Sequence, residues 1–488
     1  MADPMAPPFR ILAVTCLLVV ASPACSAEPP DTSPALPSAP VYSGCAAPPT
    51  VFRRVLVVDP ARSQGDGSAR APFPRLDQAL AQARAGDLVL LRTGDYGKVS
   101  ISGVNTGFIT VAAAAGQEPV LKGLRVESNA SYWRLSGLRI VGAPDPVMDG
   151  GWPVHPPLVR FFGGDNIVFD RNTVATTLDD FPWEAWEQGR QPSRFLSNGV
   201  MTESGVCVSL AGNTLRNLFD GIAAGGDQST GRGRSILIEG NQIDGFAGDG
   251  IDIYGSQMLL RRNTIQNSHD LCQDICIHTD GIQGWAYHNL PGRTNVNVEI
   301  DANTIIQQTI PKMALPADDL HGITIFSGDW DGVRVANNVV VTPAWHGLSL
   351  YGAHNATVVN NTVLSPSRDR SAWILITSGK PDDPTPLNVV VRNNITSALN
   401  IGQPREPTKG VTADHNLVTD DPKSLFVAFD PAHARYDLHL APNSKALHRG
   451  LRTAAPSSDI EGRARGDDAD VGAYAGENSG DKGGAAAR

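Results

Sequence analysis

The chain has 488 residues, and 41% of them are hydrophobic, which is enough for a large core. Its formal net charge is −10 and no basic run stands out, so nucleic-acid binding is not expected, because phosphate contacts need clustered Lys and Arg. Length alone suggests about three domains, but an internal repeat predicts one stacked structure instead.

Residues 1–27 have the pattern of an export signal. Arg10 precedes an apolar run, Ile11–Val20, and small residues follow as far as Ala27. This run is too short to span a bilayer and has the length of a signal-peptide core. We therefore expect a secreted or periplasmic protein without a membrane span. The sequence around Cys25 faintly resembles a lipoprotein box, so a lipid anchor at Cys25 is the alternative.

The remaining chain divides into three parts by composition. Residues 28–50 are rich in Pro and Ser and are predicted to be a disordered linker. Residues 51–475 form the ordered part, in which residues 74–85 carry apolar side chains at helical spacing. We expect this short helix to cap an open solenoid end. Residues 476–488 form a Gly- and Ala-rich tail that should be disordered.

Two short phrases recur through the ordered part. The first, Asp249-Gly-Ile-Asp-Ile-Tyr-Gly255, has copies that begin at Asp280, His321 and His346. The second is an apolar-x-apolar run followed by Asn-x-apolar. A unit of roughly 22 to 40 residues with short strands and no helix predicts a solenoid of stacked coils. One column of stacked amides is predicted from Asn172, Asn213, Asn241, Asn263, Asn303 and Asn361.

Alternation along the first phrase predicts which side chains face outward. Ile251 and Ile253 should point into the core, so Asp252 and Tyr254 should point out. Equivalent positions on stacked coils, about 4.8 Å apart, then form three columns. The turn column is Asn198, Asp220, Asp249, Asp280, His321 and His346. The middle column is Arg160, Met201, Ala223, Asp252, Gln283, Thr324 and Ser349. The third column is Phe162, Glu203, Gly225, Tyr254, Trp285, Phe326 and Tyr351.

Four consecutive aromatic residues stand in the third column, namely Tyr254, Trp285, Phe326 and Tyr351. Outward aromatic rings are costly in water unless they meet a partner, and sugar rings offer an apolar C–H face. This row predicts a glycan-binding platform. The alternative is structural, in which long loops fold over the column and bury it.

Three carboxylates, Asp249, Asp252 and Asp280, should lie within two coils of one face. Such crowding needs a proton held at a raised pKa, a metal ion or a cationic neighbour. Two carboxylates with separated pKa values suit glycoside hydrolysis, with His321 in a supporting role. The alternative is structural, since Asp before Gly is a common turn residue and stacked Asp can form ladders. For Asp220 we favour that structural interpretation.

The same three carboxylates could instead bind Ca²⁺, which prefers carboxylate oxygens. In a lyase or an epimerase the ion would neutralise a uronate while a base removed the C5 proton. Candidates for that base are His321, Lys312 and His278. We also expect His278, Lys312 and His346 to line the substrate groove.

Cysteine usage fits an oxidising compartment. Once a signal peptide is removed, Cys45, Cys207, Cys272 and Cys276 remain. Cys272 and Cys276 lie in one loop and are predicted to form a disulfide. A metal site that also uses His278, or free thiols, are the alternatives.

The Asn phrase, the opening Pro72–Leu80 and the ending Asp470–Tyr474 together resemble secreted proteins of the pectin-lyase-like superfamily. The resemblance covers about residues 54–475. It implies an all-β fold, a right-handed parallel β-helix. That superfamily includes polysaccharide lyases, glycoside hydrolases such as polygalacturonases, uronate epimerases and phage tailspikes.

Two site residues can be carried over from polygalacturonases. The segment His278-Thr-Asp280-Gly resembles their Asn-Thr-Asp-Gly strand, and His321-Gly-Ile resembles their Gly-His-Gly strand. Their intervening Asp-Asp coil has no match, because Asp318-Asp319 lies on the same coil as His321. There is also no Asp-Pro-His-Asp epimerase motif and no Arg/Lys row of the pectate lyase kind.

We therefore predict an exported, monomeric or surface-tethered β-helix that cleaves glycosidic bonds of a polysaccharide over residues 249–351. Hydrolysis and β-elimination are both open, with hydrolysis slightly favoured by the acidic, lysine-poor face. The alternatives are a uronate C5-epimerase and a non-catalytic glycan-binding envelope protein.

Overall fold

A computed structural model describes most of the predicted ordered part. The described residues are 42, 44–142, 155–178, 196–226, 232–269, 278–285, 294–311, 320–326, 328–378, 384–402 and 410–476, with the strand pairs 148–149 and 152–153. The predicted signal peptide, the possible lipid anchor at Cys25, the start of the linker and residues 477–488 lie outside them.

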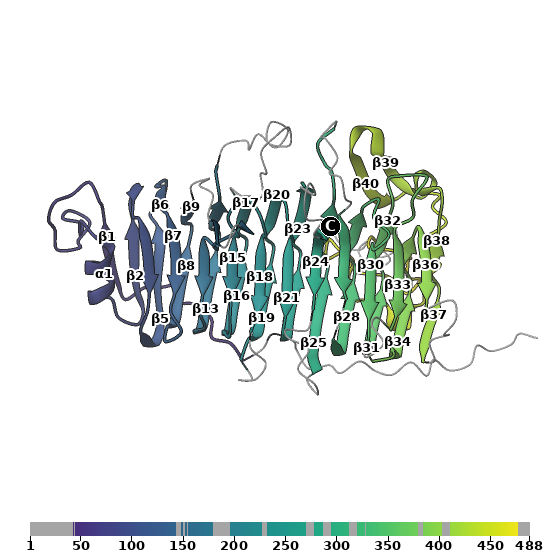
Figure 1. Ribbon diagram of the computed structural model, residues 1–488, viewed down its shortest axis with the longest axis horizontal. Coiled ribbons are helices and arrows are strands. Elements are labelled where there is room, and N and C mark those ends of the chain that lie inside the picture. Colours follow the sequence, from purple (N-terminus) through teal and green to yellow (C-terminus); the bar gives the residue numbers. More distant parts are fainter. Residues whose placement is uncertain are drawn as a thin grey trace, which may run out of the picture. The chain divides into compact units, whose positions relative to one another are not determined.

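Three long parallel sheets make up the described chain, and each coil adds one strand to each sheet (Figure 1). Sheet 1 has 13 strands: β1 (Arg54–Val58), β2 (Asp87–Leu91), β5 (Val104–Ala113), β8 (Ser131–Ser136), β13 (Asp165–Asp170), β16 (Val206–Ala211), β19 (Arg234–Glu239), β22 (Ser256–Arg261), β25 (Thr294–Asp301), β28 (Asp329–Ala336), β31 (Ala353–Val359), β34 (Leu387–Arg392) and β37 (Val411–Asp414).

Sheet 2 has 11 strands: β4 (Lys98–Ile101), β7 (Gly123–Val126), β12 (Val159–Phe161), β15 (Val200–Thr202), β18 (Ile222–Gly225), β21 (Ile251–Tyr254), β24 (Asp280–Gly284), β27 (His321–Ile325), β30 (Leu348–Tyr351), β33 (Trp373–Thr377) and β36 (Ala398–Ile401). Sheet 3 has 12 strands: β3 (Gly94–Asp95), β6 (Pro119–Leu121), β9 (Arg139–Val141), β14 (Thr173–Ala175), β17 (Thr214–Leu218), β20 (Gln242–Phe246), β23 (Thr264–Ser268), β26 (Thr304–Ile306), β29 (Val339–Val341), β32 (Thr362–Leu364), β35 (Ile395–Thr396) and β38 (Leu417–Val418).

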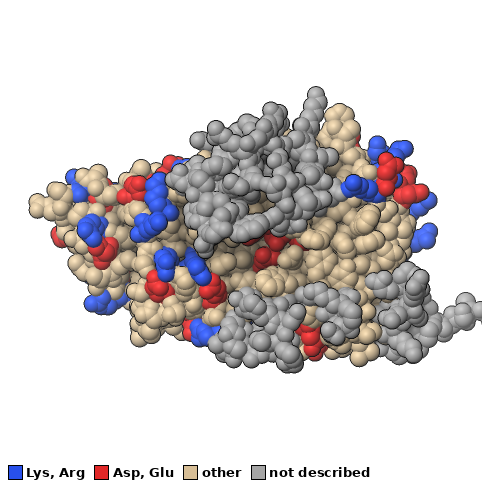
Figure 2. All heavy atoms as spheres, viewed as in Figure 1, with Lys and Arg blue, Asp and Glu red and all other residues tan. Residues whose placement is uncertain are grey.

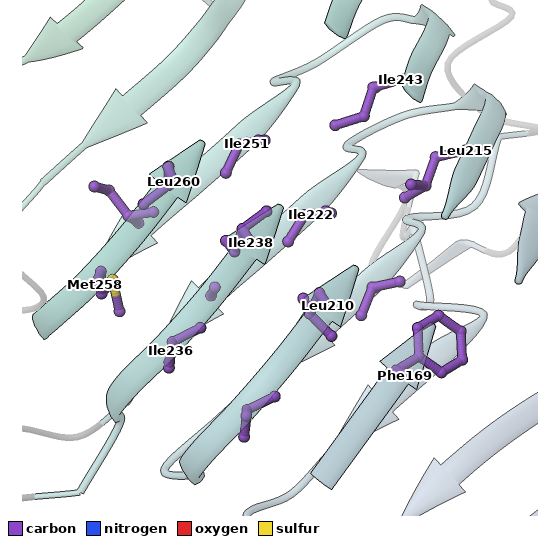
Figure 3. Packing of buried hydrophobic residues seen from close by; sticks show 14 of the residues in the cluster. Phe169, Leu210, Leu215, Ile222, Ile236, Ile238, Ile243, Ile251, Met258 and Leu260 are labelled. Atoms are coloured by element: carbon purple, nitrogen blue, oxygen red, sulfur yellow. The ribbon is translucent and has the colours of Figure 1, made fainter. Parts of the chain in front are cut away.

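Apolar side chains of the three sheets point inward and stack in register. Phe169, Leu210, Ile238 and Leu260 occupy equivalent positions on successive strands of sheet 1 (Figure 3). Each is fully buried, and full burial of such a side chain contributes about 1.5–3 kcal/mol. Ile251 and Ile253 are fully buried as well, so their predicted inward position is confirmed.

The predicted asparagine column is confirmed as a continuous hydrogen-bonded ladder. The Asn263 amide Nδ2 donates to Asn303 Oδ1 at 2.9 Å and to the Ile238 carbonyl at 2.9 Å. Its Oδ1 accepts from both the backbone N–H and the Nδ2 of Asn241, each at 3.0 Å. The ladder also includes three residues beyond the predicted six, Asn338, Asn394 and Asn416.

Both ends of the stack carry additional structure. Helix α1 (Leu76–Gln82) is shorter than the predicted 74–85, and it buries Leu76 and Ala79 against the first coils. At the other end an antiparallel pair, β39 (Phe426–Asp430) and β40 (Arg435–Leu440), packs a second apolar cluster on strands of sheet 3. The minor elements are β10 (Met148–Asp149), β11 (Trp152–Pro153), η4 (Pro422–Ser424), η5 (Pro431–His433) and η6 (Arg452–Ala454).

One disulfide joins Cys45 to Cys207, at a sequence separation of 162. It attaches the end of the predicted linker to β16. The predicted bridge between Cys272 and Cys276 lies outside the described residues and stays a prediction. A helix both long and apolar enough to cross a membrane is not found in the described part of the chain.

Candidate active site

The outer face of sheet 2 carries the predicted site columns in the predicted register. In the middle column each residue pairs with the next across adjacent strands: Arg160, Met201, Ala223, Asp252, Gln283, Thr324 and Ser349. In the turn column Asp280 pairs with His321. Figure 2 shows Asp and Glu atoms gathered where Figure 1 places β18, β21 and β24.

A column of glycines fixes the turn that precedes each site strand. A Cβ added to Gly250 would lie 2.6 Å from the Gly281 carbonyl oxygen and 2.6 Å from the Ile265 side chain. Only glycine allows the backbone to turn this closely against sheet 3, which is why Gly follows each turn residue. The column consists of Gly199, Gly221, Gly250, Gly281, Gly322 and Gly347.

The acidic part of the turn column is itself a ladder. Asp220 Oδ1 accepts the Asp249 backbone N–H at 2.9 Å, and Asp249 Oδ1 accepts that of Asp280 at 2.7 Å. The structural interpretation favoured for Asp220 therefore holds in this geometry. It also applies to Asp249, which was predicted as a catalytic residue.

This ladder holds its carboxyl groups away from water and near one another. Burial raises the pKa of Asp220 to about 6. Burial first, and then the charges of Asp252, Asp280 and Asp220, raise the pKa of Asp249 well above its usual range. Burial, and then the charges of Asp220 and Asp280, also raise the pKa of Asp252 well above its usual range. A hydrogen bond with Asp249 lowers this pKa but does not offset the rise. Burial and mutual proximity therefore favour the protonated form of these carboxyl groups.

Asp252 differs from its neighbours because one oxygen has no bond. Its Oδ1 is buried and makes no hydrogen bond, while Asp249 and Asp220 both accept backbone N–H groups. A buried polar atom left unpaired costs about 1–3 kcal/mol. A protonated carboxyl or a bound ligand would lower that cost.

Asp280 is fully buried, which corrects its predicted outward position. Its Oδ1 accepts from the Thr324 hydroxyl at 2.5 Å and lies 3.4 Å from His321 Nδ1, and its Oδ2 accepts from Gln283 Nε2 at 2.8 Å. The side chain of Asp280 is 0% exposed and that of His321 is 16% exposed. In this arrangement the buried Asp280 lies beside the partly exposed His321, whose Nδ1 is buried and makes no hydrogen bond.

Three imidazoles meet beside this carboxylate. The His321 ring centroid lies 5.2 Å from that of His278 and 4.9 Å from that of His346. Burial, and then the neighbouring His321, lowers the pKa of His346 to about 4. Its Nδ1 bonds to the Ser349 hydroxyl at 2.9 Å, so His346 is held neutral and fixed in place.

The aromatic column is only partly a surface platform. Tyr254 is buried at 7% exposure and its ring lies 5.7 Å from that of Trp285, so this ring does not form part of an exposed surface. Phe326 and Tyr351 are half-buried and stacked at 5.4 Å, and Phe326 also contacts His346. The rings that remain accessible therefore cluster around the imidazoles.

Bonds from the turn residues Asp280 and His346 to the residue three positions later were not predicted from the sequence. Asp280 bonds Gln283 and His346 bonds Ser349 in this way, which fixes both functional groups. The regular spacing between the turn and middle columns was the available signal. Lys312, Cys272 and Cys276 lie outside the described residues.

The described residues contain no group of three or more His, Cys, Asp or Glu side chains placed to hold a metal ion. Each of Asp249 and Asp280 already gives oxygens to hydrogen-bond donors of the protein. Calcium at Asp249, Asp252 and Asp280 stays a prediction.

Comparisons with known proteins support the fold. A family model described as "Right handed beta helix region" matches residues 198–396. Among similar solved structures, pectate lyase Pel9A is 15% identical, with 87% of this chain and 97% of that chain covered and a TM-score of 0.45. A rhamnogalacturonan lyase is 14% identical, with 78% of this chain and 92% of that chain covered and a TM-score of 0.45. PfbA, a surface adhesin of Streptococcus pneumoniae, is 10% identical, with 70% of this chain and 86% of that chain covered and a TM-score of 0.40. No curated protein matches the sequence. The family model and the three parallel sheets together identify the fold as a right-handed parallel β-helix.

Proposed function

We propose that this protein is an exported carbohydrate-active enzyme that cleaves glycosidic bonds of a polysaccharide on the outer face of sheet 2. The observation that carries the proposal is the arrangement of two unlike pairs on neighbouring coils. Asp249 and Asp252 have raised pKa values caused by burial and by their acidic neighbours, and Asp280 Oδ1 lies 3.4 Å from His321 Nδ1. Glycosidic cleavage needs one group that gives a proton and one that takes a proton.

Asp252 is the proposed general acid. Burial and the neighbouring carboxylates raise its pKa, which favours the protonated form, and its buried Oδ1 makes no hydrogen bond within the protein. Asp249 shares the proton and is fixed by the Asp280 backbone N–H. Asp252 would transfer its proton to the glycosidic oxygen as the bond to the leaving sugar breaks.

His321 is the proposed base, and Asp280 is its positioning residue. Asp280 Oδ1 near His321 Nδ1 favours the tautomer that leaves Nε2 unprotonated and available to the substrate side. His321 lies two coils from Asp252, about 10 Å along the stack, which leaves room for a sugar and a water. In hydrolysis His321 takes a proton from water as the water attacks the anomeric carbon.

β-Elimination is the second candidate, and the imidazole cluster favours it. His321 would then take the C5 proton of a uronate, while Asp252 protonates the leaving oxygen and a C4–C5 double bond forms. The neutral His346 ring beside His321 reduces competition for that proton. The same two residues serve both reactions, so the products decide between them.

The Cys45–Cys207 disulfide supports the proposed secreted, periplasmic or surface-tethered location, since disulfides persist in oxidising compartments. A monomeric state, with or without a lipid anchor, is part of the same proposal.

The test is incubation of the purified chain with a panel of neutral and uronic-acid polysaccharides. New reducing ends without absorbance from an unsaturated uronate mean hydrolysis, and both signals together mean elimination. Binding without either signal means a glycan-binding protein, and the enzymatic proposal then fails. Inversion at C5 without cleavage, read by proton NMR, means an epimerase.

Asp280→Asn should lower the rate about 10²–10⁴-fold, because Asn favours the wrong His321 tautomer. The thermal midpoint should change little, since Asn still accepts from Thr324. Full activity in Asp280→Asn would show that this carboxylate is only structural. Loss of activity in the wild type only after calcium chelation would instead favour a metal site.

A further inference from the structure

We infer that Trp345 and Trp373 form an additional sugar-stacking subsite one to two coils beyond His321, so that the ligand is an extended glycan chain. This inference rests on the proposed function. Neither tryptophan belongs to the three predicted columns. Trp345 lies in the turn before β30, and Trp373 begins β33.

Trp345 presents an indole to solvent at 63% exposure. A single exposed apolar residue needs no explanation, but this one is part of a continuous group of rings. Trp345 lies 6.0 Å from Trp373, and Trp373 lies 5.2 Å from His346, which in turn lies 4.9 Å from His321. The ring group therefore runs from the exposed indole directly to the proposed base.

The backbone under Trp345 differs from that of the preceding coils. There, each column glycine donates its N–H to the turn residue of the next coil, as Gly322 does to the His346 carbonyl at 2.8 Å. Gly347 instead donates back to the Trp345 carbonyl at 2.9 Å, and Trp373 donates to the same oxygen at 2.9 Å. Two hydrogen bonds thus anchor the turn that carries the exposed indole.

The glycine column ends at this same point. Trp373 stands in register with Gly347, at the position where the six preceding coils carry glycine. Its indole Nε1 lies 3.4 Å from His346 Nδ1. A bulky ring replaces glycine here, and it supports both the exposed Trp345 and the imidazole beside the proposed base.

Chemistry identifies the occupant as a pyranose ring. An indole face offers a large apolar surface at low conformational cost, and its aromatic electrons attract the polarised C–H groups of a sugar face. A rigid anchored turn reduces the ordering cost of binding. Coils repeat about every 4.8 Å, so this subsite lies about 5–10 Å beyond His321 along the stack. From Asp252 the site crosses three coils to reach Trp345, about 14 Å along the stack, so only a chain longer than a disaccharide spans it.

The experiment compares Trp345→Ala, Trp345→Phe and the control Val418→Ala in the full chain. Val418 is 53% exposed on β38 of sheet 3, away from the proposed site. The probes are polygalacturonate, alginate and xylan, each as polymer and as dimer. Affinity is measured by calorimetry, and acrylamide quenching of tryptophan emission reports ring protection.

We expect Trp345→Ala to weaken polymer binding about tenfold or more and to leave dimer binding unchanged. Trp345→Phe should retain most of the affinity, and Val418→Ala all of it. Polymer should protect the wild type from acrylamide more than it protects Trp345→Ala. If Trp345→Ala binds polymer as the wild type does, the inference is wrong and the proposed function stands. If the wild type binds and cleaves none of the probes, the proposed function fails with it.

Discussion

The asparagine ladder and the turn column are two solutions to the same geometric problem. Both stack one polar residue per coil, and both satisfy a backbone N–H group of an adjacent coil. Asn263 Oδ1 accepts from Asn241 on the preceding coil, and Asp249 Oδ1 accepts from Asp280 on the following coil. The amide column is neutral, buried and fully bonded. The turn column uses ionisable carboxyl groups, and burial raises the pKa values of Asp220, Asp249 and the adjacent Asp252.

The two columns differ in how completely their side chains are hydrogen-bonded, and this difference decides which column can bind a ligand. Stacked amides both donate and accept, so every member is satisfied and nothing is left for a ligand. Stacked carboxylates only accept when ionised, so crowding them raises their pKa values and leaves atoms such as Asp252 Oδ1 unpaired. The candidate site therefore lies on the column that stacks carboxyl groups, and not on the column that stacks amides.

The largest expected effect comes from Asp252→Asn, which tests whether the carboxyl groups beside the turn column are needed for activity. Asp252→Asn turns one carboxyl into an amide of the same size and removes the proposed proton donor. We expect kcat/KM to fall about 10³-fold. The decline of wild-type activity toward alkaline pH, which reports loss of the Asp252 proton, should also disappear. A pH–rate profile unchanged in shape and height would contradict the role of Asp252.

The reverse exchange tests the structural half. Asn263→Asp places a carboxylate in the amide ladder and removes the N–H donors to Ile238 and Asn303. We expect a loss of about 3–5 kcal/mol at pH 7, measured by urea unfolding, because a buried charge is left without its bonds.

The deficit of Asn263→Asp relative to the wild type should shrink as pH falls from 7 towards about 4, because burial raises the pKa of the new carboxyl above its unfolded-state value, and it should change no further below about pH 4. Asp249→Asn is the matched control, since Asn keeps the acceptor for the Asp280 N–H and removes a charge. Equal destabilisation by both variants would contradict the claim that the amide ladder depends on its N–H donors while the turn column needs only acceptors.

A smaller effect concerns pH and stability alone. Asp220 has a pKa raised to about 6, so the folded state binds its proton more tightly than the unfolded state does. Stability from this group is therefore full at low pH and is lost as pH rises from about 4 through about 6. Asp220→Asn should be about 1–2 kcal/mol more stable than the wild type at pH 7 and equal to it near pH 3.5. A constant difference at every pH would refute this origin.

The sequence was sufficient for the fold and for the register of the site. A side-chain period of two, together with the Gly and Asn phrases, determines which residue of each coil faces its equivalent on the next, and Asp280 opposite His321 follows directly. Burial of Asp280 and Tyr254 could not be predicted, because it depends on how side chains lean and pack across coils. The Cys45–Cys207 pairing was equally hidden, since spacing does not reveal partners 162 residues apart.

That disulfide also determines how the chain carries mechanical load. A force applied at the N-terminal end reaches Cys45 and passes through the covalent bond into β16. Residues 46–206 form a covalently closed segment that pulling from this end cannot unravel. Were the protein held at a cell surface by its N-terminus, tension from a bound polysaccharide would bypass the first coils. Pulling experiments under oxidising and reducing conditions should differ by the contour length of that segment.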